Sequence, residues 1–279
     1  MKFGLHISIA GKIYEAVDRA AALSCDTFQI FSRNPRGWTA KPLKEPDVAE
    51  FRQRRKKSGI APVAVHIPYL INLGSPDDAL YRKSIQTYTE DIRRADLLDA
   101  EYFVTHLGSH RGEGEEFGLK RIADGLQAAL SETRPKLKVL LENTAGSGDS
   151  LGHSPEQIAR ILEMVPDEKY LGLCLDTAHA YGAGYDVADE EGLNAFLEKI
   201  ERLLGKTRLC LIHANDSKAK LGSRVDRHDD IGAGKIGLNG FQIIVNHPKL
   251  KALPFILETP KKEPDEDEKN LAAIRTLVN

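Results

Sequence analysis

The sequence predicts an α/β fold, a TIM (β/α)8 barrel forming a single domain over residues 1–279. Eight short runs are apolar nearly throughout, as strands of a parallel sheet covered on both faces are. Segments with helical periodicity alternate with these runs, and eight such units in about 250 residues is the number that closes a barrel. No linker rich in Pro, Gly or Ser divides the chain into two domains.

The expected strands and helices follow one another in a regular order. We expect strands at residues 2–6, 27–31, 62–66, 101–106, 137–142, 170–176, 208–213 and 255–258. We expect helices at residues 11–23, 47–58, 77–98 and 154–164, one ending near 133, one at 190–204 and one beginning near 265. Asp77 and the Ser154-Pro155 pair are typical helix starts. A doubly wound open sheet is the alternative, but no GxGxxG motif follows the first strand.

Composition excludes several classes of protein. The net charge of −2 argues against strong nucleic-acid binding through bulk charge, although a local basic face is compatible with it. Three scattered cysteines, an odd number without a CxxC motif, indicate free thiols in a reducing compartment. No signal peptide is apparent, and no run approaches the roughly 18 apolar residues of a membrane helix. We therefore expect a cytoplasmic protein that does not associate with membranes.

Residues able to bind a metal stand at the ends of six predicted strands. These residues are His66, His106, Glu142, Asp176, His213 and Glu258. In a parallel barrel the carboxyl ends of all strands meet at one face, where active sites lie. The six side chains should therefore converge, although they are spread over almost 200 positions.

Three further ligand candidates lie just past strand ends. They are His179, Asp226 and His228, the last two in an Asp-x-His pattern that suits an extended segment or turn. The nine candidates, five imidazoles and four carboxylates, exceed what one ion can use and suit two or three zinc ions. His6 ends the first strand and is expected beside the metal or the substrate rather than on the metal. His110, His153 and His247 are expected to be ordinary solvent-side histidines.

Long motifs over almost the whole chain resemble the endonuclease IV family of apurinic/apyrimidinic (AP) endonucleases. In order, they are HISIAG, NPRGW, HIPYLINLGSP, HLGSH, LENTAG, LDTAHAYGAGYD, HANDSK, DRHDDIGAGKIG and LETP. Two departures are Leu107, where the family often has proline, and Lys12, where a second glycine is common. Neither removes a candidate ligand.

The resemblance implies a trinuclear zinc enzyme. By motif, His66, His106 and Glu142 would hold one ion, Glu142, Asp176, His213 and Glu258 the second, and His179, Asp226 and His228 the third. The implied reaction is hydrolysis of the phosphodiester 5′ to an abasic site in double-stranded DNA, leaving a 3′-hydroxyl and a 5′-deoxyribose phosphate. Glu142 would be catalytic by orienting the nucleophile. A 3′-phosphodiesterase activity on blocked ends and a monomeric state are further expectations.

The resemblance also assigns DNA-binding residues, namely Arg36, Tyr69 and Leu70. An abasic site has no base for side chains to contact, so the enzyme has to recognise DNA that kinks easily. Side chains inserted into the duplex as a wedge would fill the space that the missing base leaves in the stack. Alternatively, Tyr69 and Leu70 simply pack their loop against the barrel.

Two other functions compete with this interpretation. Sugar isomerases and epimerases on the same barrel use a smaller set resembling Glu142, Asp176, His213 and Glu258, commonly with Mn²⁺ or Mg²⁺. The five additional ligand candidates favour phosphate chemistry over sugar isomerisation; they are His66, His106, His179, Asp226 and His228. A non-catalytic module that binds damaged DNA would not need a full ligand set. The sequence leaves open whether Mn²⁺ replaces Zn²⁺ at any position.

Overall fold

Eight strands form a closed parallel barrel, with β1 hydrogen-bonded to both β2 and β10. The computed structural model describes residues 1–261 and 263–279. The barrel strands are β1 (Lys2–His6), β2 (Thr27–Phe31), β3 (Val63–His66), β4 (Tyr102–Thr105), β5 (Lys138–Glu142), β6 (Leu171–Asp176), β7 (Leu209–His213) and β10 (Pro254–Leu257). The closure, with Lys2 opposite Pro254, confirms the predicted barrel and excludes the open doubly wound sheet.

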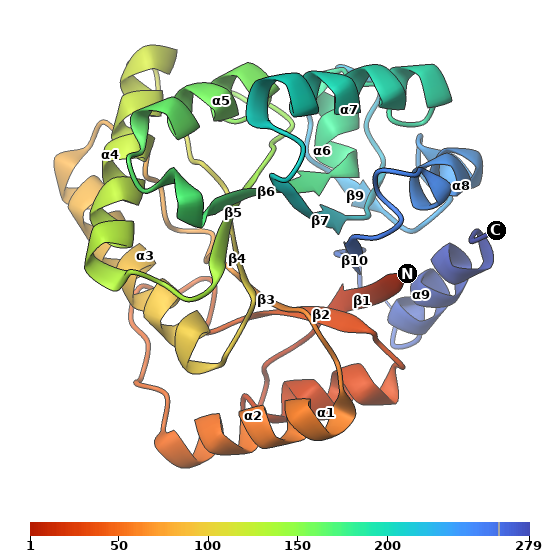
Figure 1. The fold of residues 1–279 in the computed structure, drawn as a ribbon, viewed down its shortest axis with the longest axis horizontal. Helices are drawn as coiled ribbons and strands as arrows, with labels where there is room; N and C mark the ends of the chain where they lie inside the picture. The colour runs from red at the N-terminus through yellow and green to blue at the C-terminus, as the bar shows by residue number, and fades with distance from the viewer. Residues whose placement is uncertain (262) are drawn as a thin grey trace.

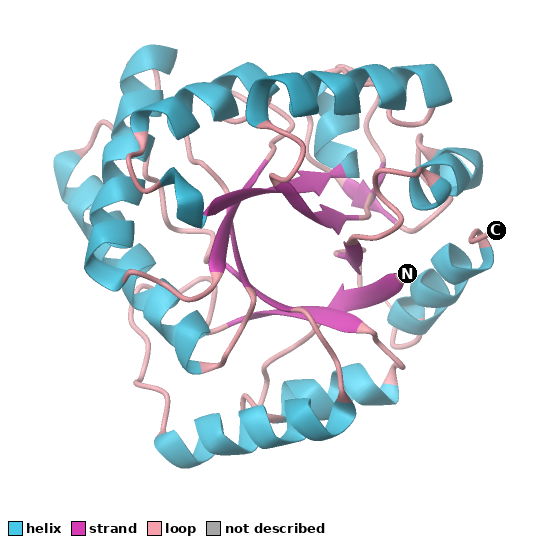
Figure 2. Ribbon diagram, viewed as in Figure 1, coloured by secondary structure: helices cyan, strands magenta, loops and turns pink. Residues whose placement is uncertain are grey.

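A layer of helices surrounds the ring of strands (Figure 1, Figure 2). The helices are α1 (Glu15–Ala22), α2 (Glu45–Ser58), α3 (Asp78–Leu97), α4 (Glu115–Thr133), α5 (Pro155–Met164), α6 (Thr177–Ala183), α7 (Glu190–Leu204), α8 (Gly237–Asn246) and α9 (Glu266–Thr276), with a 3-10 turn η1 (Glu168–Tyr170). Two predicted helix starts are confirmed: Asp77 accepts hydrogen bonds from the N–H groups of Ala79 and Leu80, and Ser154 accepts one from Gln157. In the described part of the chain, no helix is long and apolar enough to cross a membrane.

Two helices were not among those predicted from the sequence. We expected only a glycine-rich connection after β6, but α6 begins there directly, because Asp176 accepts a hydrogen bond from the N–H of His179 and so caps it. Gly184 ends this helix in the left-handed conformation with a φ of 105°. Helix α8 begins directly after a glycine-rich turn. A pair of two-residue strands, β8 (Asp216–Ser217) and β9 (His228–Asp229), lies between β7 and α8.

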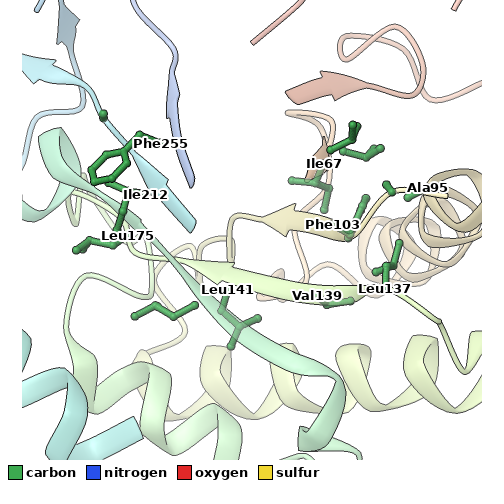
Figure 3. Close-up of a cluster of buried hydrophobic side chains, with 14 of the residues drawn as sticks. Ile67, Ala95, Phe103, Leu137, Val139, Leu141, Leu175, Ile212 and Phe255 are labelled. Atoms are coloured by element: carbon green, nitrogen blue, oxygen red, sulfur yellow. The ribbon is translucent and has the colours of Figure 1, made fainter. Parts of the chain in front are cut away.

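The apolar core has two layers. Alternate strand residues face either the barrel interior or the helices, as the period of two in a strand requires. The smaller inner cluster consists of Ala64, Val104, Leu140, Cys174, Leu211 and Ile256. The outer layer includes Phe103, Val139, Leu141, Leu175 and Phe255, which project from the strands in Figure 3. This filled interior fixes the strands rigidly, so the side chains at their carboxyl ends are held in defined positions.

Candidate metal centre

All nine predicted ligands gather at the carboxyl-terminal mouth of the barrel. Four of them, His66, Glu142, Asp176 and His213, are the last residues of their strands. His106 and Glu258 each follow a strand directly. His179 lies in the first turn of α6, Asp226 stands just before β9, and His228 is the first residue of β9. The nine ligands therefore come from the ends of strands, the first turn of one helix and one short hairpin.

Glu142 joins two groups of potential ligands. Its Oε2 atom lies 3.3 Å from Nε2 of His66 and 3.2 Å from Nε2 of His106. Its Oε1 atom lies 3.1 Å from Nδ1 of His213, and that nitrogen lies 3.3 Å from Oε2 of Glu258. Asp176 completes the second group, within which the ligand atoms all lie within 4.8 Å of one another. The two groups match the predicted first and second ligand sets.

The third group differs from the predicted set, because the ligand atoms that lie within 4.8 Å of one another are those of Asp176, His179 and His228, with Asp226 beside the two histidines. Nε2 of His179 lies 3.2 Å from Oδ1 of Asp226, and Nε2 of His228 lies 3.5 Å from the same oxygen. Asp176, which the sequence interpretation placed only in the second set, also belongs here, with its Oδ2 atom 3.6 Å from Nε2 of His228. Asp176 thus faces two groups, as Glu142 does.

Hydrogen bonds to backbone carbonyls fix three of the imidazole rings. Nδ1 of His66 faces the carbonyl of Ile67 at 2.7 Å, and Nδ1 of His179 faces that of Asn143 at 2.9 Å. Nδ1 of His228 faces the carbonyl of Glu258 at 3.1 Å. A carbonyl oxygen only accepts, so each Nδ1 donates to it, and each Nε2 is the ring nitrogen that faces the centre. Histidine ligands of metals are typically held in this way.

The centre is buried and its charges are strongly coupled. Glu142, Asp176 and His213 are fully buried, whereas the side chain of Asp226 is 48% exposed. Burial opposes ionisation of Glu142, but His213 and His106 hold its pKa well below the usual range. Burial likewise opposes a charge on His179, yet Asp176, Asp226 and Glu142 raise its pKa well above the usual value. Four carboxylates this close together repel one another, so positive charge is needed between them to balance theirs.

These residues fit bound divalent cations. Nε2 of His228 is buried and has no hydrogen-bond partner among the residues that the structure describes, although it faces Asp176 and Asp226. An unsatisfied buried nitrogen is costly, and a metal ion would satisfy it. The donor set, imidazole nitrogen and carboxylate oxygen with no thiolate, suits zinc and also manganese.

A cavity of about 720 Å³ opens over the centre. Arg36 and Tyr69 line it together with several of the candidate ligands. Leu70 lines an adjoining cavity of about 390 Å³, to which Tyr69, His66 and His106 also contribute. Tyr69 is 63% exposed, and its ring lies 5.3 Å from that of Phe31. The structure therefore places the three predicted DNA-binding residues on two neighbouring loops beside the centre.

Other polar residues of the site were missed in the sequence. Gln29 is buried within β2 and hydrogen-bonds both His213 and Glu258. Asn215 donates a hydrogen bond from Nδ2 to Asp176 at 2.6 Å. Asn143 binds the backbone of Asp176 through both ends of its amide. A glutamine inside an otherwise apolar strand was a signal for the first of these, because a buried amide requires partners.

The remaining histidines contribute no ligand to these groups. His6 lies beside the centre, with its Nδ1 atom 3.3 Å from Oε1 of Glu258, as expected. His110 accepts hydrogen bonds from the N–H groups of Gly112 and Gly114. His247, which we expected at the surface, is instead buried beside the end of α8. Its burial is tolerated because Oδ1 of Asn194 lies 3.0 Å from its Nε2 atom and satisfies it.

Comparison with known proteins identifies the family. The model of the xylose isomerase-like TIM barrel family matches residues 17–277. A probable endonuclease 4 of Methanosphaerula palustris is 49% identical over 100% of this chain and 98% of its own length. A probable endonuclease 4 of Chloroflexus aurantiacus is 45% identical over 99% of this chain and 98% of its own length. The chain belongs to the endonuclease IV family.

Solved structures agree with this family assignment. The crystal structure of endonuclease IV from Thermus thermophilus superposes with a TM-score of 0.89 at 38% identity, covering 99% of this chain and 98% of that one. A D-tagatose 3-epimerase-like protein superposes with a TM-score of 0.72 at 21% identity, covering 99% of this chain and 97% of its own. The second likeness shows a shared fold only. As a member of the endonuclease IV family, the chain is a nuclease with a cluster of potential metal ligands in its barrel mouth.

Proposed function

We propose that this enzyme uses three zinc ions to hydrolyse the phosphodiester 5′ to an abasic site in double-stranded DNA. The observation that carries the proposal is the convergence of nine potential ligands at one barrel mouth, eight of them in three overlapping groups and Asp226 beside the third group. Four of them would serve the smaller site of a sugar epimerase. The five others, His66, His106, His179, Asp226 and His228, have a use only in a larger metal cluster.

Each ion has a set of residues to hold it. His66, His106 and Glu142 would hold the first, and Glu142, Asp176, His213 and Glu258 would hold the second. His179, Asp226 and His228 would hold the third, with Asp176 beside them. When bound, zinc would supply Lewis acidity that lowers the pKa of water to about 7 and neutralises charge on the phosphate.

The side chains of the protein then perform two tasks. Glu142 orients the attacking water, because its carboxylate faces both of the first two groups and lies between their histidines. The oxygen of this water bonds to phosphorus as the bond from phosphorus to the 3′-oxygen breaks, and the proton that the water loses is balanced by the proton that the departing 3′-oxygen takes up, which leaves a 3′-hydroxyl and a 5′-deoxyribose phosphate. The buried walls of the centre keep Glu142, Asp176 and His213 fixed, so little reorganisation accompanies the reaction.

Selectivity for abasic DNA arises at the loops beside the cavity. Tyr69 exposes its ring and Leu70 adjoins it, so together they fill the gap in the stack that a lost base leaves. Arg36 is exposed on the neighbouring loop, where its charge attracts phosphate.

The same centre would remove 3′-blocking groups through a 3′-phosphodiesterase activity. We expect the enzyme to act as a monomer in the cytoplasm.

Nicking of an abasic duplex tests this function. Purified protein should nick the abasic strand on its 5′ side, lose this activity with a chelator and regain it with zinc. Analysis of bound metal should find three ions per chain. His179→Asn should abolish nicking, whereas His247→Asn, which changes a buried histidine outside the centre, should preserve it. Turnover of a ketose sugar without nicking would select the epimerase alternative, and binding without nicking would select a damage-binding module.

A further inference from the structure

Gln29 occupies an unusual place for an amide side chain. It is the central residue of β2 and is fully buried, with Phe28 and Ile30 beside it in the strand. Its side chain contacts two of the proposed ligands, Glu258 and His213, which come from β10 and β7 on the other side of β1. No role for it follows from the three ligand sets.

The orientation of this amide is determined by Glu258. The Nε2 atom of Gln29 lies 2.6 Å from Oε1 of Glu258, and a carboxylate oxygen accepts hydrogen bonds, so the amide nitrogen must face it. The amide oxygen consequently faces His213, whose Nε2 atom lies 2.9 Å away. An amide oxygen cannot donate. Nε2 of His213 therefore carries the proton.

This arrangement decides which nitrogen of His213 is available to a metal. With Nε2 protonated and bound to Gln29, Nδ1 remains as the ligand atom. Nδ1 lies 3.1 Å from Oε1 of Glu142 and 3.3 Å from Oε2 of Glu258, within the second group. His213 thus differs from His66, His179 and His228, which present Nε2 and donate from Nδ1 to backbone carbonyls.

The amide nitrogen of Gln29 has a second neighbour. It lies 3.0 Å from Nδ1 of His6, the last residue of β1, and that ring nitrogen lies 3.3 Å from Oε1 of Glu258. One side chain therefore links His213, Glu258 and His6. Backbone carbonyls hold the rings of His66, His179 and His228, but His213 relies on this amide.

We propose that Gln29 is a positioning residue that holds His213 and Glu258 as ligands of the same zinc ion. The proposal rests on the proposed function in that it assumes a zinc site there. Gln29 acts through the two ligands and does not itself touch the metal or the DNA.

Substitutions of Gln29 separate positioning from a general structural role. Gln29→Met keeps the length and volume but removes both hydrogen-bonding ends. Gln29→Glu keeps an acceptor for Nε2 of His213 in either protonation state. Gln127→Met is the matched control, because Gln127 also binds through both ends of its amide, to Ser131 and Asp167, far from the centre.

Zinc affinity and a nuclear magnetic resonance signal provide the readouts. Competition with a chelator should show one zinc ion bound about 10- to 100-fold more weakly in Gln29→Met, the range for lost partners of metal ligands. In zinc-loaded protein with ¹⁵N-labelled histidine, the Nε2–H signal of His213, assigned by its absence in His213→Asn, should persist in wild type and Gln29→Glu. Rapid exchange with water should broaden it in Gln29→Met.

The outcomes distinguish this inference from the function on which it rests. Wild-type zinc affinity together with an unchanged His213 signal in Gln29→Met would overturn the role of Gln29 while leaving the zinc centre intact. Equal weakening of zinc in Gln127→Met would overturn it too, since the effect would then be general destabilisation. Wild-type protein that binds no zinc would overturn both proposals.

Discussion

Nε2 of His179 lies 3.2 Å from Oδ1 of Asp226, although one residue lies in the first turn of a helix and the other in an exposed loop. This contact connects the loop before β9 to the barrel mouth. Asp226 is the most exposed of the nine proposed ligands, so its removal should disturb the fold least.

We predict that Asp226→Asn lowers the zinc content from three ions per chain to two. The nicking rate should fall roughly 100-fold, since a metal ligand supports several kcal/mol of transition-state stabilisation. Mass analysis of bound zinc and nicking assays on one preparation check both points. Asp149→Asn is a suitable control, because that side chain is also 48% exposed and also faces a histidine, His110, at 4.0 Å. Three zinc ions retained in Asp226→Asn would contradict the third set.

Zinc removal should lower the stability of the protein as well as its activity. The centre holds two fully buried carboxylates, Glu142 and Asp176, whose charges zinc would balance. A ligand that binds only the folded state at 1,000 times its Kd stabilises it by about 4 kcal/mol. We therefore predict a clear fall in Tm on chelation and its recovery with added zinc, measured by calorimetry. An unchanged Tm would mean that no buried site had been emptied.

The sequence predicted the parts of the centre that depend on strand ends. His66, Glu142, Asp176 and His213 could be located because apolar runs mark the strands and parallel strands end together. The dual position of Asp176 was not predictable, since it follows from the direction of α6, whose cap is the same side chain. Gln29 was overlooked because its role depends on contacts with β7 and β10, which lie far away in the sequence.

Tyr69 offers a test of how abasic DNA is recognised. The residue is 63% exposed, and its ring contacts that of Phe31 edge-on, an arrangement that leaves the ring free to stack on a base. We predict that Tyr69→Ala weakens binding to abasic duplex by about 5- to 150-fold, corresponding to roughly 1–3 kcal/mol for base–aromatic stacking. Binding to intact duplex should change little, and Tyr69→Phe should bind as wild type does. Fluorescence anisotropy at one fixed salt concentration measures all of these affinities. Equal losses on both duplexes would favour a loop-packing role.

A buried ion-pair cluster supports the loop that carries Arg36. Nε of Arg33 lies 2.6 Å from Oδ1 of Asp91, which also accepts a hydrogen bond from Ser32. Arg33 in turn donates to the carbonyl of Trp38, and Arg94 to that of Lys41. Asp91 is therefore the anion that holds together two cations and, through them, the loop after β2.

The pH dependence of stability should reveal Asp91. Burial raises the pKa of Asp91 to about 6 from its ordinary value of 3.8, an effect that Arg33 and Arg94 only partly offset. The folded state thus binds this proton more tightly than the unfolded state does. The resulting stabilisation is complete below pH 3.8 and is lost as the pH rises through about 6. A difference of about two pKa units corresponds to about 3 kcal/mol.

Asparagine at this position cannot titrate, so the variant isolates the contribution of the proton. We predict that the free energy of unfolding of wild type, relative to Asp91→Asn, falls by up to about 3 kcal/mol between about pH 4 and pH 7. Urea unfolding with a chelator present measures it, because proton competition for zinc is then absent from both proteins. Asp149→Asn, an exposed carboxylate, should show no such trend. A relative stability of wild type that rises with pH would instead mean that Arg33 and Arg94 outweigh burial and keep Asp91 ionised.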